Sequence, residues 1–592
     1  MRRKIQKWSV WMGLGVLFLT AGATPLPAQG EAEVPVEEFT LDNGMKFLLV
    51  QRPELTTVSA GWVARVGSAN ERPGMTGISH LFEHMMFKGT RHIGTKDIER
   101  DLQIIQEQEE IQTRIREIYA EQRARYRRGE IDDPFAPENR TPEQLELEER
   151  FNQLVQEQRD LMIKDEFDKI YTSEGASGMN AGTSEDFTVY FITVPANKLE
   201  LWFWMESDRL LDPVFREFYS ERDVVHEERR LRTESTPTGK FDEQFNAMFW
   251  ESHPYSWPVV GWPSDLRVIS KEEADGYFGT YYAPDNLTAA LVGNFEIDEA
   301  KALAERYFGR LEPSPYPAPD VVTLEMPQLA EKRMVAECDC QPQTEVRYHT
   351  VPFMHVDSYP LDVLAGLLNG RTGRLYKSLI VDQEIASQAF SNQSSDKYAG
   401  SFSFFAETKG DATPGQLEDG WYAELQRIID DPIPDEELQK VKNRIQADAF
   451  RRLENPFFLL LQLLIYDNNG DWQYLNTWAD KTMAVTAEDV KRVASDYLTP
   501  DNRAVALYFR KEGAAAEEWP EFITALPQQQ QQMVKQQIRQ LQAIQDVAQL
   551  QQIAAQIAAQ KGGAPPEFAP ALDAIERWVQ NRIAELSGQG GE

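Results

Sequence analysis

Apolar residues recur at two different spacings along this chain. Some segments have the two-residue spacing of strands and others have the three-to-four-residue spacing of helices, so we expect both kinds of element. Residues 186–191 alternate apolar and polar side chains as a strand does, and Asp42-Asn43-Gly44 separates two alternating runs as a hairpin turn. Residues 102–170 instead place apolar side chains three and four positions apart among Glu, Gln and Arg. This stretch predicts two long helices joined by a loop at 132–137.

The end of the chain also has a helical pattern. A Gln-rich stretch from about residue 527 carries apolar residues at helical spacing, namely Leu541, Ile544, Val547 and Leu550. A second helix is expected at 572–586, after the break at Gly562-Gly563. Two alternatives remain open for this tail, which are binding to a partner and packing on its own domain.

The pattern divides the 592 residues into several parts. We expect a first unit at 37–310, which contains the helical insertion at 102–170, and a second unit of similar size at 328–511. A Pro-rich linker at 311–327 separates the units, and a Gln-rich helical tail occupies 512–592.

The N-terminus predicts an exported protein. Residues 1–28 combine a basic start, a short apolar run and small residues, as a secretory signal does, although an uncleaved anchor is the alternative. No other long apolar segment is present, so we expect no stable membrane insertion after signal removal, and a periplasmic location if the source is Gram-negative. The net charge of −34 argues against a nucleic-acid binder.

The chain has two cysteines, Cys338 and Cys340, on either side of Asp339. A disulfide between residues so close in sequence is difficult to form without strain. We therefore favour two incidental thiols over a redox-active or metal-binding pair.

A candidate metal site lies in the sequence His80-Leu81-Phe82-Glu83-His84. On a helix, residues four apart lie on one face, so both imidazoles can reach one ion, and Glu83 is placed to take a proton from a metal-bound water. This H-x-x-E-H order is the inverzincin signature. The alternative without a functional site is a surface helix with solvated His and Glu, but the apolar residues around the motif favour a buried functional helix.

A third ligand is expected far along the chain. Glu221 and Glu228 are seven residues apart in Glu221-Arg222-Asp223-Val224-Val225-His226-Glu227-Glu228, so they share a helix face. Together, H-x-x-E-H and E-R-x-V-V-x-x-E resemble the pitrilysin/insulinase family of zinc peptidases, which includes the mitochondrial processing peptidases. The resemblance implies that Glu228, rather than Glu227, is the third ligand and that Glu221 is a supporting residue near the metal.

Other segments extend the resemblance over most of residues 37–510. They are similar to the family's motifs at 175–184, 253–255, 261–265, 281–286 and 291–295. The resemblance implies an α+β fold of two similar units, each an antiparallel sheet packed by helices, with the helical hairpin insertion and the helical tail as additions. It also implies a chamber built from four such units, held in one chain or in two.

The expected chemistry is hydrolysis of peptides or unfolded proteins with one Zn²⁺ per chain. His80, His84 and Glu228 would hold the ion, Glu83 would transfer the proton, and Glu221 would orient a ligand. An extended substrate would add a strand beside Asn180, Ala181 and Thr183.

Besides the insertion and the tail, the chain departs from the family at a pair of substrate-binding residues. Members often carry an Arg and a Tyr in a unit without zinc, where they help to hold the substrate carbonyl, but Ile380 and Ser387 stand at the corresponding positions. We prefer a zinc-bearing subunit whose homologous partner supplies the Arg-Tyr pair over a weakened peptidase. The rival class is a non-catalytic subunit that binds peptides or supports assembly.

Overall fold

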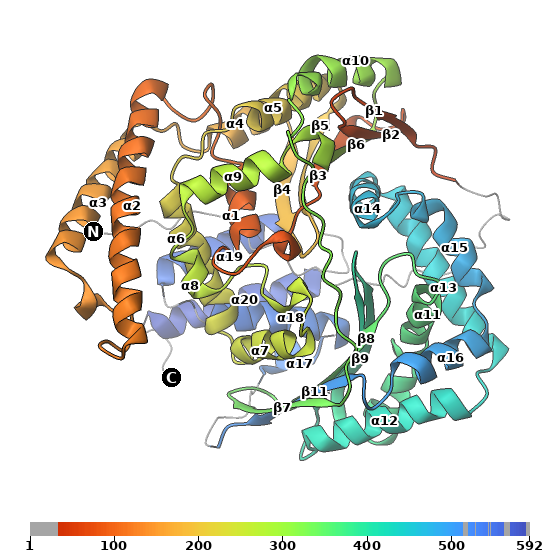
Figure 1. The fold of residues 1–592 in the computed structure, drawn as a ribbon. Coiled ribbons are helices and arrows are strands. Elements are labelled where there is room, and N and C mark those ends of the chain that lie inside the picture. The colour runs from red at the N-terminus through yellow and green to blue at the C-terminus, as the bar shows by residue number, and fades with distance from the viewer. Residues whose placement is uncertain are drawn as a thin grey trace.

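Two β-sheets flanked by helices form the body of the protein (Figure 1). The computed structural model describes residues 33–512, 519–526, 528–542, 544, 546–561 and 569–587. The predicted signal at 1–28 and the break at Gly562-Gly563 lie outside these ranges. Across the described ranges, each helix is too short or too polar to cross a bilayer.

The first sheet has six strands in the order β1-β2-β6-β3-β5-β4. The strands are β1 (Glu37–Thr40), β2 (Lys46–Gln51), β3 (Thr57–Ala64), β4 (Ser177–Thr183), β5 (Thr188–Pro195) and β6 (Leu287–Gly293). Their side chains share a core with the helices α1 (Ile78–Met85), α5 (Leu199–Leu211), α9 (Lys271–Tyr281) and α10 (Ile297–Tyr307). β4 lies at the edge of this sheet.

The second sheet repeats the topology of the first. Its order is β7-β11-β8-β10-β9, from β7 (Lys332–Cys338), β8 (Gln343–Thr350), β9 (Ala386–Ser395), β10 (Gly400–Thr408) and β11 (Arg503–Arg510). It packs against α11 (Ser358–Leu368), α12 (Pro414–Asp430), α13 (Asp435–Glu454) and α16 (Ala487–Tyr497). The α+β class with two similar units is therefore confirmed.

Neither sheet is purely antiparallel. β2 runs parallel to β6, and β7 runs parallel to β11. In each unit the final strand returns after intervening helices and inserts between the two earlier strands, where it pairs parallel to one and antiparallel to the other. The sequence pattern of each strand alone does not reveal this pairing.

The first sheet is covered on both faces, because a helix from the second unit's sequence packs on its outer side. Every residue of β6 is buried. Leu48 and Val292 from the sheet share a cluster with Leu460 and Leu464 of α14 (Pro456–Asn469). Continuous burial of a strand follows from cover on both faces. The two units therefore share an apolar interface.

A buried carboxylate adds polar contacts to this interface. The Asp467 side chain on α14 is 2% exposed and pairs with Lys46 at 2.8 Å and Arg65 at 3.1 Å. It also accepts a hydrogen bond from Thr288 of β6. One carboxylate thus takes three donors from the first unit.

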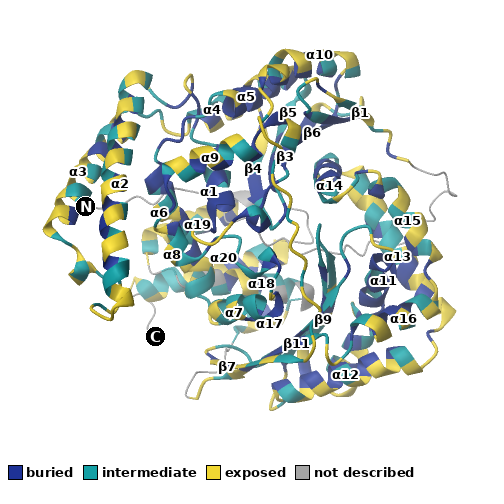
Figure 2. Ribbon diagram, in the orientation of Figure 1, coloured by how far each residue is buried: buried dark blue, intermediate teal, exposed yellow. Residues whose placement is uncertain are grey.

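The predicted insertion forms a helical hairpin of α2 (Ile98–Arg127) and α3 (Pro142–Leu161) at one side of the molecule (Figures 1 and 2). Its long outer surfaces are exposed, while glutamines such as Gln108 and Gln158 meet between the two helices. The hairpin lies against α6 (Phe218–Arg229), where the hydroxyl of Tyr219 donates to Glu109 and accepts from Arg116 of α2.

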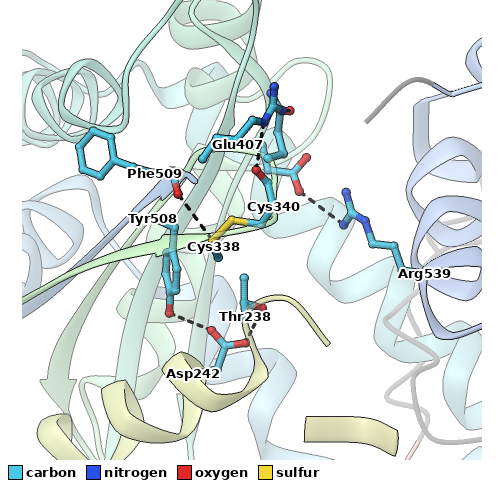
Figure 3. Close-up of a disulfide and its surroundings, with 10 residues drawn as sticks. Thr238, Asp242, Cys338, Cys340, Glu407, Tyr508, Phe509 and Arg539 are labelled. Carbon is cyan, nitrogen blue, oxygen red and sulfur yellow. Dashed lines mark hydrogen bonds and ion pairs between the residues drawn. A yellow bond between two sulfur atoms is a disulfide. The ribbon is translucent and has the colours of Figure 1, made fainter. Parts of the chain in front are cut away.

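The tail forms α17 (Glu521–Thr524), α18 (Gln528–Gln542), α19 (Val547–Lys561) and α20 (Ala569–Leu586). These helices bury a cluster of their own, which includes Ile538, Leu550 and Ile575. Arg539 of α18 pairs with Glu407 of β10 at 3.6 Å, which links the tail to the second sheet (Figure 3). The amphipathic pattern of the tail therefore serves packing among its own helices.

The expectation of two free thiols is wrong, because a disulfide joins Cys338 and Cys340 (Figure 3). Cys338 ends β7 and is buried, and Cys340 lies just beyond the strand. The chain bends at Asp339 so that the two Cα atoms are 5.2 Å apart, a separation that a disulfide can span. Closeness in sequence alone did not exclude the bond.

Asp467→Asn should lower the free energy of unfolding by about 2 kcal/mol, because Lys46 and Arg65 lose a charged acceptor at a buried position. Urea denaturation followed by tryptophan fluorescence measures the change. Asp480→Asn, at an exposed position on α15 (Tyr474–Ala484), is the matched control and should shift stability by less than about 0.5 kcal/mol. Equal effects of the two substitutions would contradict the role of Asp467.

Candidate metal centre

The helix α1 carries His80, Glu83 and His84, and the local sequence fixes where it starts. Gly77 precedes it with φ of 91°, and a Cβ at this position would lie 2.6 Å from the carbonyl oxygen of Val260. The buried carboxyl group of Glu71 accepts hydrogen bonds from the backbone N–H groups of Gly77 and Ser79, both at 2.8 Å. A carboxyl group at this end satisfies N–H groups that have no helical partner.

The helix α6 brings Glu221 and Glu228 to the same place. The Nε2 atom of His80 lies 3.9 Å from Glu228 Oε1, and the Nε2 atom of His84 lies 3.5 Å from Glu228 Oε2. On the other side of its ring, His84 Nδ1 lies 3.4 Å from Glu221 Oε2. The two residues predicted on one face of a helix thus contact opposite sides of one imidazole.

The donor set fits a zinc ion. Ligand atoms of His80, His84 and Glu228 all lie within 4.8 Å of one another. Zinc bonds of about 2.0–2.2 Å to nitrogen and oxygen place donors about 3.3–3.6 Å apart, so a small contraction suffices. His80 Nδ1 is buried and has no hydrogen-bond partner among the described residues. Two imidazoles and one carboxylate leave room for the water that a catalytic zinc site needs.

The protonation states differ between the two histidines. Burial, aided by the neighbouring His84, lowers the pKa of His80 to about 3, so this ring is neutral and ready to bind a metal. Burial alone would lower the pKa of His84 as well, but hydrogen bonds to Glu221 and Glu228 raise it to about 9. In the absence of a metal, His84 therefore carries a proton at neutral pH.

The carboxylates at the site are not equivalent. Burial opposes ionisation of Glu228, yet the hydrogen bond with His84 and the positive charge of Arg232 help to hold its pKa at about 2. Burial raises the pKa of Glu83, and the opposing effects of His84 and Thr183 do not cancel this rise. A ligand that stays ionised and a neighbouring carboxyl that can exchange a proton suit metal binding and proton transfer, respectively.

The residues expected to bind substrate lie on the edge strand β4. Thr183 donates a hydrogen bond of 2.8 Å from Oγ1 to Glu83 Oε2, so this strand ends beside the site. Asn180 and Ala181 lie on β4 as well, where they pair with β5, and Ala181 packs into the core. The structure brings Thr183 to the metal centre, while no recorded contact joins Asn180 or Ala181 to the predicted ligands.

Lys88 and Arg216 are site residues that the sequence reasoning missed. Lys88 donates to Glu221 at 2.5 Å and to Glu217 at 3.3 Å, and it lies just beyond the end of α1, four residues after His84. That spacing was a usable signal for Lys88. Arg216 had none, because an isolated arginine before a polar helix is normally a solvated residue.

Arg216 is fully buried and connects the segments around the site. Its guanidinium donates to the carbonyl oxygens of Lys88 and Ile93 at 3.1 Å and of Thr90 at 2.6 Å. It also pairs with Asp101 at the base of the hairpin at 2.5 Å. One side chain therefore fixes the segment after α1, the start of α6 and the inserted hairpin relative to one another.

Comparisons with known proteins agree with this fold and site. Residues 46–113, which include His80, Glu83 and His84, match the family described as "Insulinase (Peptidase family M16)". Residues 269–445 match "Peptidase M16 inactive domain", and this match contains none of the predicted ligands. The chain is a homologue of the M16 zinc proteases, the insulinase and pitrilysin-like class.

Its relatives include bacterial proteins that match over nearly their whole length. A protein named "Zinc protease PqqE" from Helicobacter pylori is 25% identical over 84% of this chain and 97% of the relative. "Uncharacterized zinc protease YmxG" from Bacillus subtilis is 21% identical over 79% of this chain and 96% of its own length.

Solved structures show the same fold. The structure of a protease from Helicobacter pylori matches with a TM-score of 0.66 at 24% identity. The match covers 80% of this chain and 99% of that protease. The periplasmic protease PqqL from Escherichia coli has a TM-score of 0.60 at 15% identity. This match covers 84% of the present chain but 49% of PqqL, so the chain corresponds to about half of that protein.

Zinc binding near neutral pH should release about one proton, because His84 must lose the proton that its pKa of about 9 retains. The apparent affinity should rise about tenfold per pH unit between pH 7 and 8. Calorimetric titration in buffers of different ionisation enthalpy measures both quantities. Glu221→Gln should reduce the release, whereas His92→Ala, at an exposed histidine outside the site, should not. An affinity independent of pH over this range would refute the expectation.

Proposed function

We propose that this chain is a zinc-dependent endopeptidase that cleaves unstructured peptides, with His80, His84 and Glu228 holding one Zn²⁺. The observation that carries the proposal is the convergence of both imidazoles on the two oxygens of Glu228, with Glu83 beside them. Homologues named as zinc proteases support the same activity.

Bound zinc would polarise the scissile carbonyl and lower the pKa of a water molecule. Glu83 would take one proton from the attacking water, whose oxygen would bond to the carbonyl carbon. When the C–N bond breaks, its electron pair stays on nitrogen, and Glu83 returns the proton to that nitrogen. The raised pKa of Glu83, caused mainly by burial, suits a group that both accepts and donates a proton. The hydrogen bond from Thr183 orients its carboxyl group.

Glu221 acts on the far side of His84. It accepts from the ring at Nδ1 and is held by Lys88, so it orients the imidazole and keeps Nε2 toward Glu228. We therefore assign Glu221 to the alignment of a ligand rather than to proton transfer.

The substrate would bind as an extended strand. β4 is an edge strand that pairs with β5 alone, and its last residue, Thr183, contacts Glu83. A peptide that pairs with the other side of β4 near Asn180 and Ala181 would pass over the metal centre. Main-chain pairing of this kind favours unfolded or flexible peptides over particular side chains.

The chain would act with a homologous partner. Ile380, on the π-helical segment at Tyr376–Asp382, packs against the second core, and Ser387 on β9 donates to the carbonyl oxygen of Glu407. Neither side chain offers the guanidinium and phenol of the family pair. The correspondence of this chain to about half of PqqL is consistent with a second half supplied by another subunit.

We further propose an exported location. The disulfide between Cys338 and Cys340 favours an oxidising compartment, and PqqL is described as periplasmic. A non-catalytic, peptide-binding subunit is the second candidate function. The match of residues 269–445 to an inactive domain favours it, although the zinc-site residues themselves argue for catalysis.

Glu83→Gln should retain zinc and lose at least about 1,000-fold in peptide cleavage, because the amide cannot accept the proton. Cleavage of a mixed library of unstructured peptides, measured for each chain alone and with a partner that restores the Arg-Tyr pair, together with metal analysis of the same sample, tests this. Glu227→Gln is the matched control, since Glu227 is exposed and pairs with Arg230 away from the ligands.

The comparison also separates the two candidate functions. Substantial cleavage by Glu83→Gln would reject the assigned role of Glu83. Robust cleavage by the wild-type chain alone would contradict the need for a partner. Zinc binding without cleavage, even with a partner that restores the Arg-Tyr pair, would favour the peptide-binding subunit.

A further inference from the structure

Arg232 is a cation at the metal centre that the mechanism above does not use. Its Nη1 atom lies 2.7 Å from Oε1 of Glu228, the residue four positions earlier in the chain. Burial has the largest effect on the pKa values of His80, Glu83 and Glu228, and the positive charge of Arg232 lowers all three. The guanidinium therefore lies close to both the predicted ligands and the predicted base.

The backbone around Arg232 departs from a regular α-helix. Residues Arg230–Glu234 form a π-helical turn directly after α6, in which the N–H of Ser235 donates to the carbonyl oxygen of Arg230. Single π turns are rare in proteins and are frequent at functional sites. Here the turn begins two residues beyond the third predicted ligand.

The side chain of Arg232 is available to a substrate. It is 53% exposed, and its pair with Glu228 is its one recorded ion pair within the described ranges. A guanidinium has five N–H donors in a planar fork, and this pair engages Nη1. When a divalent cation neutralises Glu228, the attraction between Glu228 and Arg232 weakens, so the guanidinium can turn toward a bound peptide.

The chemistry at the site calls for such a donor. When water adds to the scissile carbonyl, the π-electron pair moves onto oxygen, which becomes an oxyanion. The surrounding carboxylates of Glu83, Glu221 and Glu228 oppose this new negative charge. Lys88 is already held by Glu221 and Glu217, and Ile380 and Ser387 of the second unit supply no cation.

We propose that Arg232 is a catalytic residue that binds the scissile carbonyl oxygen of the peptide and stabilises the oxyanion through its guanidinium. This role rests on the proposed peptidase function. Arg232 keeps its proton throughout, and when the C–N bond breaks the electron pair of the oxyanion restores the carbonyl. The contribution is expected mainly in the transition state, where the charge on oxygen is greatest.

The competing explanation is that Arg232 only offsets the charge of Glu228. A matched control is available in Arg230, two residues before Arg232, which is 52% exposed and pairs with Glu227 instead of a predicted ligand. Arg232→Ala, Arg232→Lys and Arg230→Ala therefore form the test set. Zinc affinity by chelator competition reports the charge-compensation role separately.

The main experiment measures binding of two probes to zinc-loaded protein. One is a phosphinic peptide, whose tetrahedral anion mimics the transition state, and the other is the amide peptide of the same sequence, measured in the Glu83→Gln background. Arg232→Ala should weaken phosphinic peptide binding about 100-fold while amide binding changes less than about threefold. Millimolar guanidinium should restore part of the loss, and Arg230→Ala should behave like the wild type.

The outcomes distinguish the two proposals. Equal effects of Arg232→Ala and Arg230→Ala, or a change in zinc affinity with no selective loss of the phosphinic peptide, would overturn the role of Arg232 alone. Failure of the zinc-loaded wild type to bind either peptide, both alone and with a partner that restores the Arg-Tyr pair, would overturn the peptidase function, and the role of Arg232 with it. In a sample that cleaves peptides, Arg232→Ala should lower kcat and leave KM nearly unchanged.

Discussion

The position of α6 against α1 is the constraint on which the candidate site depends. The predicted ligands come from two helices far apart in sequence, so neither helix alone can define the geometry. Arg216, fully buried before α6, holds the carbonyl groups that follow α1 and pairs with Asp101 of the hairpin. Removal of one partner from a buried pair typically costs about 3–5 kcal/mol, and here the loss would fall on the junction that orients Glu228.

The helical insertion contributes to the position of α6. The hairpin contacts the ligand helix at its base through Asp101 and farther along through Glu109 and Arg116, which hold the hydroxyl of Tyr219. Its loop also reaches the body, where Arg267 lies over the ring of Phe135. The insertion therefore contacts the segment just before α6 at Arg216 and the first turn of α6 at Tyr219, the helix that carries Glu221 and Glu228.

Charge balance is the second organising feature of the site. Glu83, Glu221 and Glu228 meet in a largely buried space, where unpaired charges are costly. Lys88 compensates Glu221, a protonated His84 compensates both ligand-helix carboxylates, and Arg232 approaches Glu228 from the exposed side. A divalent metal would replace the proton on His84, so metal binding and proton release are parts of one equilibrium.

The sequence predicted the parts of the site that depend on short-range spacing. His80, Glu83 and His84 share one helical face, and the alternating run at 186–191 overlaps β5. The pairing of that helix with Glu228 came from the family resemblance, because no local pattern links residues so distant in sequence. The α+β class of two units followed from the same resemblance and is confirmed.

Other features were outside the reach of sequence patterns. Asp101 lies in a polar stretch that resembles solvated surface, and Arg216 is a single arginine among mostly apolar residues. Their burial as a pair depends on the packing of three separate segments. The cover of the first sheet by α14 depends on how the two units meet. The disulfide between Cys338 and Cys340 depends on a local bend that residue spacing does not specify.

The central claim is that one zinc ion binds between α1 and α6. Anomalous diffraction at the zinc absorption edge, from crystals of the zinc-loaded full chain, tests it most directly. The account predicts a single peak within about 2.0–2.2 Å of Nε2 of His80, Nε2 of His84 and a carboxylate oxygen of Glu228. A peak bound by Glu227 or by residues elsewhere, or zinc-saturated protein without a peak at this site, would contradict it.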